Sequence, residues 1–234
     1  DDLGCMNNVL TTTFKLIVDD DNCITEVSNY FGKTNWAQTV NVNKFNGNCG
    51  TLQSINYTVS GVSFSAQRYE STANGGSTVT VTETNNLAVT APAGGTLNLP
   101  LNHTESHSLT TFDGMVDFMG TSGYKDANAT YTSTTGSSAA YATFTGAGTI
   151  GFPATANAFT DMNSTGGNNE FVIETYMGAD VVIHYCFSNP LTVAPQSACV
   201  GGTVTLTAVG NNNYPYNWVL PSGATFTGNP LVIN

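Results

Sequence analysis

Three side chains that could take part in acid–base or metal chemistry recur at every second position of one stretch. His103, Glu105 and His107 would share one face of a β-strand. Two imidazoles and a carboxylate are a plausible ligand set for a divalent metal. On a straight strand, however, successive ligands lie about 6.6 Å apart, too far to share one ion unless the strand bends. The spacing therefore favours a polar outer face over a metal site.

Carboxylate side chains gather in two predicted loops, where their oxygens could bind calcium. The candidate ligands are Asp19 and Asp21 in the first loop and Asp113 and Asp117 in the second. Neither loop has the spacing of an EF-hand. The alternative is solvated charge or turn chemistry, in which an aspartate accepts hydrogen bonds from its own backbone. Calcium is the one cofactor that the sequence suggests, and a bound ion would relieve repulsion in a chain of net charge −11.

Catalytic motifs are missing from the sequence. There is no Gly-x-Ser-x-Gly elbow, and no histidine is placed beside a specific nucleophile. His184 lies opposite the apolar face of a predicted core strand, where a packing role is the simpler interpretation. Asp113 and Asp117 could form a carboxylate pair, but turn chemistry explains them as well. We therefore predict no catalytic residues and no enzymatic activity.

The composition indicates an all-β protein. Charged residues are 9% of the chain, against roughly 25% in ordinary soluble domains. Sixteen acidic and five basic residues leave no basic footprint, which excludes a nucleic-acid phosphate binder. No apolar run approaches the ~18 residues that would span a bilayer. Thr, Val, Tyr and Phe favour strands, and Asn and Gly supply turns.

Short alternating segments separated by Gly and Asn turns predict an antiparallel, jelly-roll-like β-sandwich over residues 1–187. The 52–69 segment is expected to bend at Gly61 through a bulge or corner. The predicted strands are 11–18, 36–45, 52–69, 77–83, 87–90, 96–101, 106–112, 141–144, 149–156, 171–176 and 180–187.

A second domain is predicted over residues 188–234, after the Asn189-Pro190 boundary. Cys199 before one strand and Trp218 in the next resemble the skeleton of an immunoglobulin-like sandwich. The segment is shorter than the ~100 residues of such a fold. We therefore expect the N-terminal part of a truncated immunoglobulin-like domain, and a chain that is a fragment of a longer protein. The final segment, 228–234, is expected to be an unpaired strand with an apolar edge.

The five cysteines suit a secreted protein rather than a zinc or thioredoxin-like site, because none forms a Cys-x-x-Cys pair. The polar N-terminus resembles a processed one. Two disulfides could form among four candidates, with three possible connectivities. Pairing Cys5 with Cys23 and Cys49 with Cys186 would close an N-terminal hairpin and tie two strand ends; buried free thiols are the alternative. Cys199 is the odd cysteine, and its partner is expected further along a longer chain.

Several glycine-rich motifs between about residues 30 and 187 resemble the choice-of-anchor E domain of secreted bacterial surface proteins. They include Trp36-Ala37-Gln38, Gly50-Thr51-Leu52, Phe112-Asp113-Gly114, Gly120-Thr121-Ser122-Gly123, Phe144-Thr145-Gly146 and Gly166-Gly167-Asn168. The first thirty residues, with two cysteines, depart from that family. Residues 198–207 resemble the immunoglobulin-like repeats of long Bacteroidota surface proteins, among them gliding-motility adhesins exported by type IX secretion. The resemblance implies display at the cell surface and assigns no catalytic residues.

The function predicted from the sequence is a structural and adhesive module at or near the N-terminus of a long secreted cell-surface protein. Its partners would be glycans or other extracellular surfaces, together with secretion or surface-anchoring machinery. The alternative is a carbohydrate-binding module of a secreted protein. That module would need an aromatic platform on one sheet face, drawn from Tyr124, Tyr131, Tyr141 and Tyr176. A secreted hydrolase is a distant third, because the motifs that it would need are missing.

Overall fold

The computed structural model describes residues 15–17, 22–47, 50–188, 192–194, 196, 203–209, 217–219, 222–228 and 230–233. The chain divides into two units. The sandwich unit comprises Ile24–Phe45 and Ser54–Tyr185. The small-sheet unit comprises Asp1–Cys23, Asn46–Gln53 and Cys186–Asn234.

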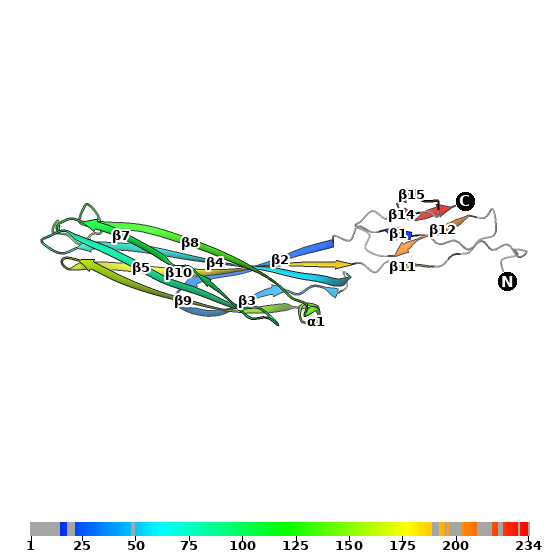
Figure 1. Ribbon diagram of the computed structural model, residues 1–234, viewed down its shortest axis with the longest axis horizontal. Helices are drawn as coiled ribbons and strands as arrows, with labels where there is room; N and C mark the ends of the chain where they lie inside the picture. Colours follow the sequence, from blue (N-terminus) through cyan, green and yellow to red (C-terminus); the bar gives the residue numbers. More distant parts are fainter. Residues whose placement is uncertain are drawn as a thin grey trace, which may run out of the picture. The chain divides into compact units, whose positions relative to one another are not determined.

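Two antiparallel sheets of long strands pack on each other and build the sandwich unit (Figure 1). The four-stranded sheet has the order β2-β10-β4-β8, with bounds Asn22–Lys33, Asn169–Ser188, Thr51–Ser71 and Gly123–Ser137. The five-stranded sheet has the order β3-β9-β5-β6, and β7 also pairs with β5. Its bounds are Trp36–Asn43 (β3), Thr149–Thr165 (β9), Ser77–Thr90 (β5), Thr96–Pro100 (β6) and His103–Leu109 (β7). The predicted all-β sandwich is confirmed.

The core of the sandwich lies between the sheets and follows the alternation of the sequence. Along β5, Val79, Val81, Leu87 and Val89 are completely buried, and the even-numbered residues of the strand face outward. A strand presents successive side chains to opposite faces, so this pattern turns one face of the sheet inward. Ring contacts join the two sheets: Tyr57 of β4 meets Phe152 of β9 edge to face, with centroids 5.7 Å apart.

The predicted bulge or corner at Gly61 is wrong. β4 runs without interruption, and its residues pair one for one with β8 from Asn56 to Glu70. Gly61 serves close packing instead. A Cβ at this position would lie 3.0 Å from Leu87 and 3.2 Å from Leu101, both of which are buried.

Residues 141–144, predicted as a strand, form the one-turn helix α1 (Tyr141–Phe144). Thr143 N donates to Ala140 O, and Thr145 Oγ1 donates to Tyr141 O. Of the four residues, only Phe144 is buried, against Tyr185 at a centroid distance of 6.4 Å. One inward side chain is compatible with a helical turn, so four residues were too few for their alternation to identify a strand.

A disulfide joins Cys23 to Cys186, which are 163 residues apart in the sequence. The two cysteines lie on β2 and β10, neighbouring strands of one sheet. The favoured pairing of Cys5 with Cys23 and of Cys49 with Cys186 is therefore wrong, because adjacent strands bring together residues that the sequence separates. Cys5, Cys49 and Cys199 lie outside the described residues.

Short paired strands form the small-sheet unit. β14 lies between β1 and β15, β11 pairs with β13, and β12 pairs with β16. Their bounds are Lys15–Ile17 (β1), Thr192–Val193 (β11), Val204–Leu206 (β12), Ala208–Val209 (β13), Asn217–Val219 (β14), Thr225–Thr227 (β15) and Leu231–Ile233 (β16). Trp218 is buried in a cluster with Leu206, Ala208 and Leu231, and its Nε1 donates to Gly228 O at 2.8 Å.

Two expectations for the C-terminal region differ from this arrangement. The last strand was expected to be unpaired, but β16 pairs with β12 and Leu231 is buried. A single boundary was expected between residues 187 and 188, but β1 pairs with β14, so an N-terminal segment shares a unit with the C-terminal residues. Pairing between chain ends is a non-local contact that no local pattern specifies.

Candidate functional site: an aromatic sheet face

The outer face of the four-stranded sheet carries aromatic and apolar side chains. Along β4, the odd-numbered side chains from Tyr57 to Ser71 are buried. Val62 and Phe64 therefore point to the opposite, outer side of the sheet. The register places Tyr131 of β8 opposite Val62, on the same face. Phe64 is 36% exposed and Tyr131 is 74% exposed.

The other two strands extend this face. Phe31 of β2 is 56% exposed and stacks on Tyr176 of β10, with ring centroids 6.0 Å apart and planes 9° from parallel. Gly178 leaves room for the contact, since a Cβ there would lie 2.8 Å from the Phe31 ring and 2.9 Å from Val62. All four strands thus contribute to one surface. We call it the aromatic face, defined by Phe31, Val62, Phe64, Tyr131 and Tyr176.

Polar contacts between β2 and β10 flank the aromatic face. On one side, Lys33 Nζ donates to Glu174 Oε1 at 2.8 Å. This hydrogen bond and the opposite charge raise the pKa of Lys33 and lower that of Glu174. On the other side, the Thr25 hydroxyl and the His184 Nδ1 atom lie 2.9 Å apart. His184 thus has a hydrogen-bond partner on the outer face, opposite the buried Ile183 and Tyr185.

The aromatic face offers exposed rings for contacts with other molecules. Contiguous exposed apolar surface of this kind commonly marks an interaction site. Flat aromatic rings pack against apolar surfaces, including the C–H faces of sugars, and phenol hydroxyls add hydrogen bonds. The five residues that define the face include no carboxylate, imidazole, thiol or amine. The face therefore offers ring surfaces and phenol hydroxyls as its contact groups.

Two of the four tyrosines predicted for an aromatic platform lie on this face, namely Tyr131 and Tyr176. Tyr124 instead stacks among other rings, and Tyr141 lies on α1. Sequence reasoning missed Phe31 and Phe64. Phe64 lies at an outer position of a predicted strand and could have been found from that alternation. Phe31 lies on β2, which was not predicted.

Glu105, the central residue of the His-x-Glu-x-His pattern, is a hydrogen-bond acceptor for side chains from three strands. Tyr69 Oη donates to its Oε1 at 2.8 Å, and Asn128 Nδ2 donates to its Oε2 at 2.8 Å. His103 Nε2 and His107 Nε2 lie 3.5 Å and 3.4 Å from the same Oε2. Burial would raise the pKa of Glu105, but these hydrogen bonds outweigh it and hold the pKa below its ordinary value.

This arrangement brings the three predicted residues together without forming a metal centre. In the described part of the chain, no group of three or more His, Cys, Asp or Glu side chains is arranged to hold a metal ion. His107 instead stacks on Tyr124 with centroids 3.5 Å apart, and Tyr124 stacks on Tyr69 at 5.5 Å. Burial, together with hydrogen bonds to Glu105 and Asp126 respectively, raises the pKa of Tyr69 and of Tyr124. The cluster is a packed polar junction between β4, β7 and β8.

A second buried carboxyl group lies on the inner face of β5. Glu83 is 2% exposed, and burial raises its pKa although hydrogen bonding to Ser65 opposes the shift. Ser65 Oγ and Gln67 Nε2, both on β4, donate to Glu83 Oε1. Nearby, Asn85 Nδ2 donates to Ser63 Oγ at 2.8 Å. Polar contacts therefore link the two sheets in this part of the core.

The calcium candidates that the structure describes serve the turns that contain them. Met115 N donates to Asp113 Oδ1 at 3.0 Å, and Met119 N donates to Asp117 Oδ1 at 2.9 Å. Each is an aspartate that accepts a hydrogen bond from the backbone two residues on, as the turn interpretation described. Asp19 and Asp21 lie outside the described residues. Calcium binding by this chain stays a prediction.

Comparisons with known proteins give no family. No family model and no curated protein matches the chain. Among solved structures, it is similar to that of the infectious bursal disease virus Gx strain, with a TM-score of 0.17 and 10% identity over 74% of this chain. The Gt strain structure gives 0.11 and 11% over 74% of this chain. The match spans 42% of each viral chain, and at these TM-scores the likeness carries no argument about fold or function.

Proposed function

We propose that this chain is a non-catalytic structural and adhesive module of a long, secreted cell-surface protein. The observation that supports this proposal best is the aromatic face, where Phe31, Phe64 and Tyr131 are exposed on one sheet. Its partners would be extracellular glycans or other surfaces. From the sequence resemblance, we assign the module to the choice-of-anchor E type, followed by an immunoglobulin-like repeat.

One further feature is compatible with an extracellular setting. The Cys23–Cys186 disulfide is a kind of bond that persists mainly in oxidising compartments. In the part of the chain that the structure describes, no helix is long and apolar enough to cross a membrane. Following the resemblance of residues 198–207, we propose a gliding-motility adhesin exported by type IX secretion as the specific form. Secretion or surface-anchoring machinery would then be a further partner.

A carbohydrate-binding module is the second candidate, and one observation favours it. Phe31 and Tyr176 stack with their planes 9° apart, so two neighbouring strands present nearly parallel rings on the aromatic face. Tyr131 lies on the same face at the edge strand β8. Exposed aromatic rings along one sheet face suit the apolar faces of sugars in an extended polysaccharide.

The test removes rings from the aromatic face of the 234-residue chain. Beads are coated with the wild-type chain, Phe31→Ala or Tyr131→Ala and are allowed to attach to polystyrene or to immobilised polysaccharides. The fraction of beads that stays attached after washing measures adhesion. Each substitution should weaken adhesion about tenfold, because a buried aromatic contact contributes about 1.5 kcal/mol. Tyr141→Ala is the matched control, since Tyr141 is 39% exposed but lies on α1.

The surface that retains the beads separates the two candidates. Retention on polystyrene as well as on polysaccharides supports a general adhesin, whereas saturable binding to one soluble polysaccharide supports a carbohydrate-binding module. Both proposals fail if Phe31→Ala and Tyr131→Ala adhere as well as Tyr141→Ala.

A further inference from the structure

β9 has a strand on both sides only at residues 154–156. β3 pairs with residues 149–156 and ends at Trp36, opposite Ala156. On the other side, β5 pairs with residues 154–165. Among the described residues, 157–165 therefore have a strand partner on one side only. We call this stretch the open edge of β9.

The backbone of the open edge directs hydrogen-bonding groups outward. Ala158 N donates to the Asn35 side chain, on the side away from β5. Asn85, opposite Ala158 on β5, uses its backbone groups for other residues. Its N donates to Asn102 Oδ1 at 3.1 Å, and its O accepts from Leu101 N at 2.8 Å. Because backbone groups alternate along a strand, the amides of Thr160, Met162 and Ser164 also face the open side.

Strand β10 of the other sheet also loses a neighbour near this point, because its pairing with β2 stops at Thr175. Thr34 N, in the turn after β2, donates to Thr175 O at 3.0 Å. On the opposite side of β10, Thr72 N still donates to Asn168 O at 2.9 Å, just before the strand begins. In the described part of the chain, residues 169–174 thus have β4 beside them but no strand on the β2 side.

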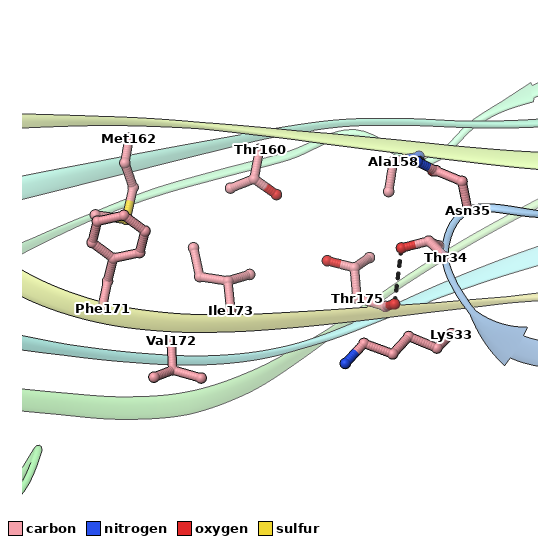
Figure 2. A pocket seen from close by; sticks show the side chains of 10 residues that line it. All are labelled: Lys33, Thr34, Asn35, Ala158, Thr160, Met162, Phe171, Val172, Ile173 and Thr175. Carbon is pink, nitrogen blue, oxygen red and sulfur yellow. Dashed lines mark hydrogen bonds between the residues drawn. The ribbon is translucent and has the colours of Figure 1, made fainter.

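A groove of about 740 Å³ lies between these two edges (Figure 2). Met162 and Thr160 of β9 point toward Phe171 and Ile173 of β10 across it, and the turn at Thr34 lies at one end (Figure 2). Met162 and Ile173 also pack against the buried cluster of Tyr69, Val79, Val81 and Leu109. The groove therefore opens directly onto the core of the sandwich.

Three of the devices that protect a sheet edge, namely lysine, proline and a bulge, are missing from both stretches, and the charged side chains there are all acidic. Natural edge strands carry lysine, proline or a bulge that prevents another strand from pairing. Residues 157–165 and 169–174 contain no Lys, Arg or Pro, and β9 pairs with β5 one for one. Phe171 is 55% exposed at the groove. An edge with free amides beside an exposed apolar groove is the arrangement that β-strand addition uses.

Charge indicates which kind of strand fits. Asp161 of β9 and Glu170 of β10 lie on the strands that border the groove, with their side chains exposed, while Lys33, the lysine at the groove, is paired with Glu174. A second copy of this chain, with a net charge of −11, would bring acidic residues against acidic residues. A basic partner strand would complement them.

We propose that the groove accepts an extended strand of a partner polypeptide, which pairs with the open edge of β9. Every second side chain of that strand is apolar and enters between Met162 and Phe171, and its flanking residues are lysine or arginine. This inference goes beyond the proposed function and does not depend on it, since the aromatic face lies on the outer side of the other sheet.

The probe is a synthetic peptide of alternating Val and Thr, as long as the open edge and with Lys at both ends. Its binding to the full chain is measured by fluorescence anisotropy, and amide hydrogen exchange is followed at Thr160 and Met162. We expect saturable binding and slower exchange at these two amides. A peptide with Pro at every position between the two Lys residues has no N–H there to donate to β9 and should not bind.

Two variants alter the groove by independent means. Phe171→Glu places a charge at the apolar wall and should weaken binding at least about tenfold, because the ring that the bound strand would cover is lost. Thr160→Pro removes one outward N–H without touching the ladder to β5 and should have a similar effect. Phe159→Glu is the matched control: Phe159 is 66% exposed on the same strand but on its outer face, so binding should not change. Circular dichroism and the unfolding midpoint establish that each variant folds.

Specific results would overturn the proposal. They are the lack of saturable binding to the wild-type chain, equal binding of the proline peptide, and unchanged binding to folded Phe171→Glu. A concentration-dependent dimer that Phe171→Glu abolishes would also overturn it, because a second copy would then occupy the groove. Loss of adhesion through the aromatic face leaves this result unaffected, so the two proposals fail separately.

Discussion

At the scale of single residues, the surroundings of a side chain decide its role more than its type does. Glu105 and its two histidines have the composition of a metal site, yet Tyr69 and Asn128 supply further donors to the same carboxylate. The sequence predicted that His103, Glu105 and His107 share a face. It could not show Tyr69 and Asn128, which come from β4 and β8 and are placed by the pairing of strands far apart in sequence.

Glu105→Gln tests the importance of this charge. At neutral pH we expect the free energy of unfolding to fall by about 1–3 kcal/mol, because hydrogen bonds to a charged acceptor are lost. The folded-state pKa of Glu105 lies below the ordinary 4.5, so its ionised form stabilises the protein above that value. That contribution is lost as the pH falls through the folded-state pKa. Urea unfolding at neutral and acidic pH should therefore show the variant and wild type converging at low pH.

Glu83→Gln provides a comparison, because the charge of Glu83 should affect the free energy of unfolding in the opposite direction. Burial raises the folded-state pKa of Glu83, so its ionisation above that pKa opposes folding.

A constant difference between Glu105→Gln and wild type across the whole pH range would contradict the role assigned to the Glu105 charge. It would indicate that packing alone accounts for the effect.

At the scale of elements, alternation predicted strands well where one face is apolar. It placed β3, β6 and the first half of β9, whose inner residues are Val, Leu, Phe and Ala. It missed β8, where Thr and Ser occupy both faces and hydropathy does not alternate. It also divided β5 and β10 in two, because Asn85 and Gly178 are weak strand formers that tertiary contacts hold in place.

Gly136 of β8 illustrates a contact that fixes two neighbouring strands. It lies opposite Tyr57, and a Cβ there would come 2.5 Å from the Tyr57 ring. Tyr57 is itself 6% exposed and rests on Phe152. Gly136→Ala should therefore cost about 1–3 kcal/mol of unfolding free energy, since the ring has little room to shift.

Gly75→Ala is the matched control for that substitution. A Cβ at Gly75 has no atom within 4 Å, so this change should be neutral or slightly stabilising in the same urea-unfolding experiment. If both substitutions change stability equally, the effect comes from the unfolded chain and not from the ring contact.

At the scale of the whole molecule, the features that matter are non-local. The aromatic face needs the register of four strands, and the open edge of β9 exists because β3 ends before β9 does. Local sequence patterns specify neither. The same limit explains the disulfide: the sequence identified Cys23 and Cys186 as bridge candidates, but only the neighbouring positions of β2 and β10 pair them.

Removing this bond tests how much it constrains the chain. We expect Cys23→Ser/Cys186→Ser to lower the free energy of unfolding by about 2–5 kcal/mol, because the bond closes a long loop and restricts the unfolded state. The sequence separation of 163 residues puts the effect toward the upper end of that range. The other three cysteines stay in place, so the difference from wild type under non-reducing conditions reports this bond alone. In a non-reduced digest of the wild-type chain, the peptide containing Cys23 should be linked to the one containing Cys186. If that linkage is found but the variant unfolds at the same urea concentration as wild type, hydrogen bonding and packing between β2 and β10 already supply the constraint that the disulfide was expected to provide.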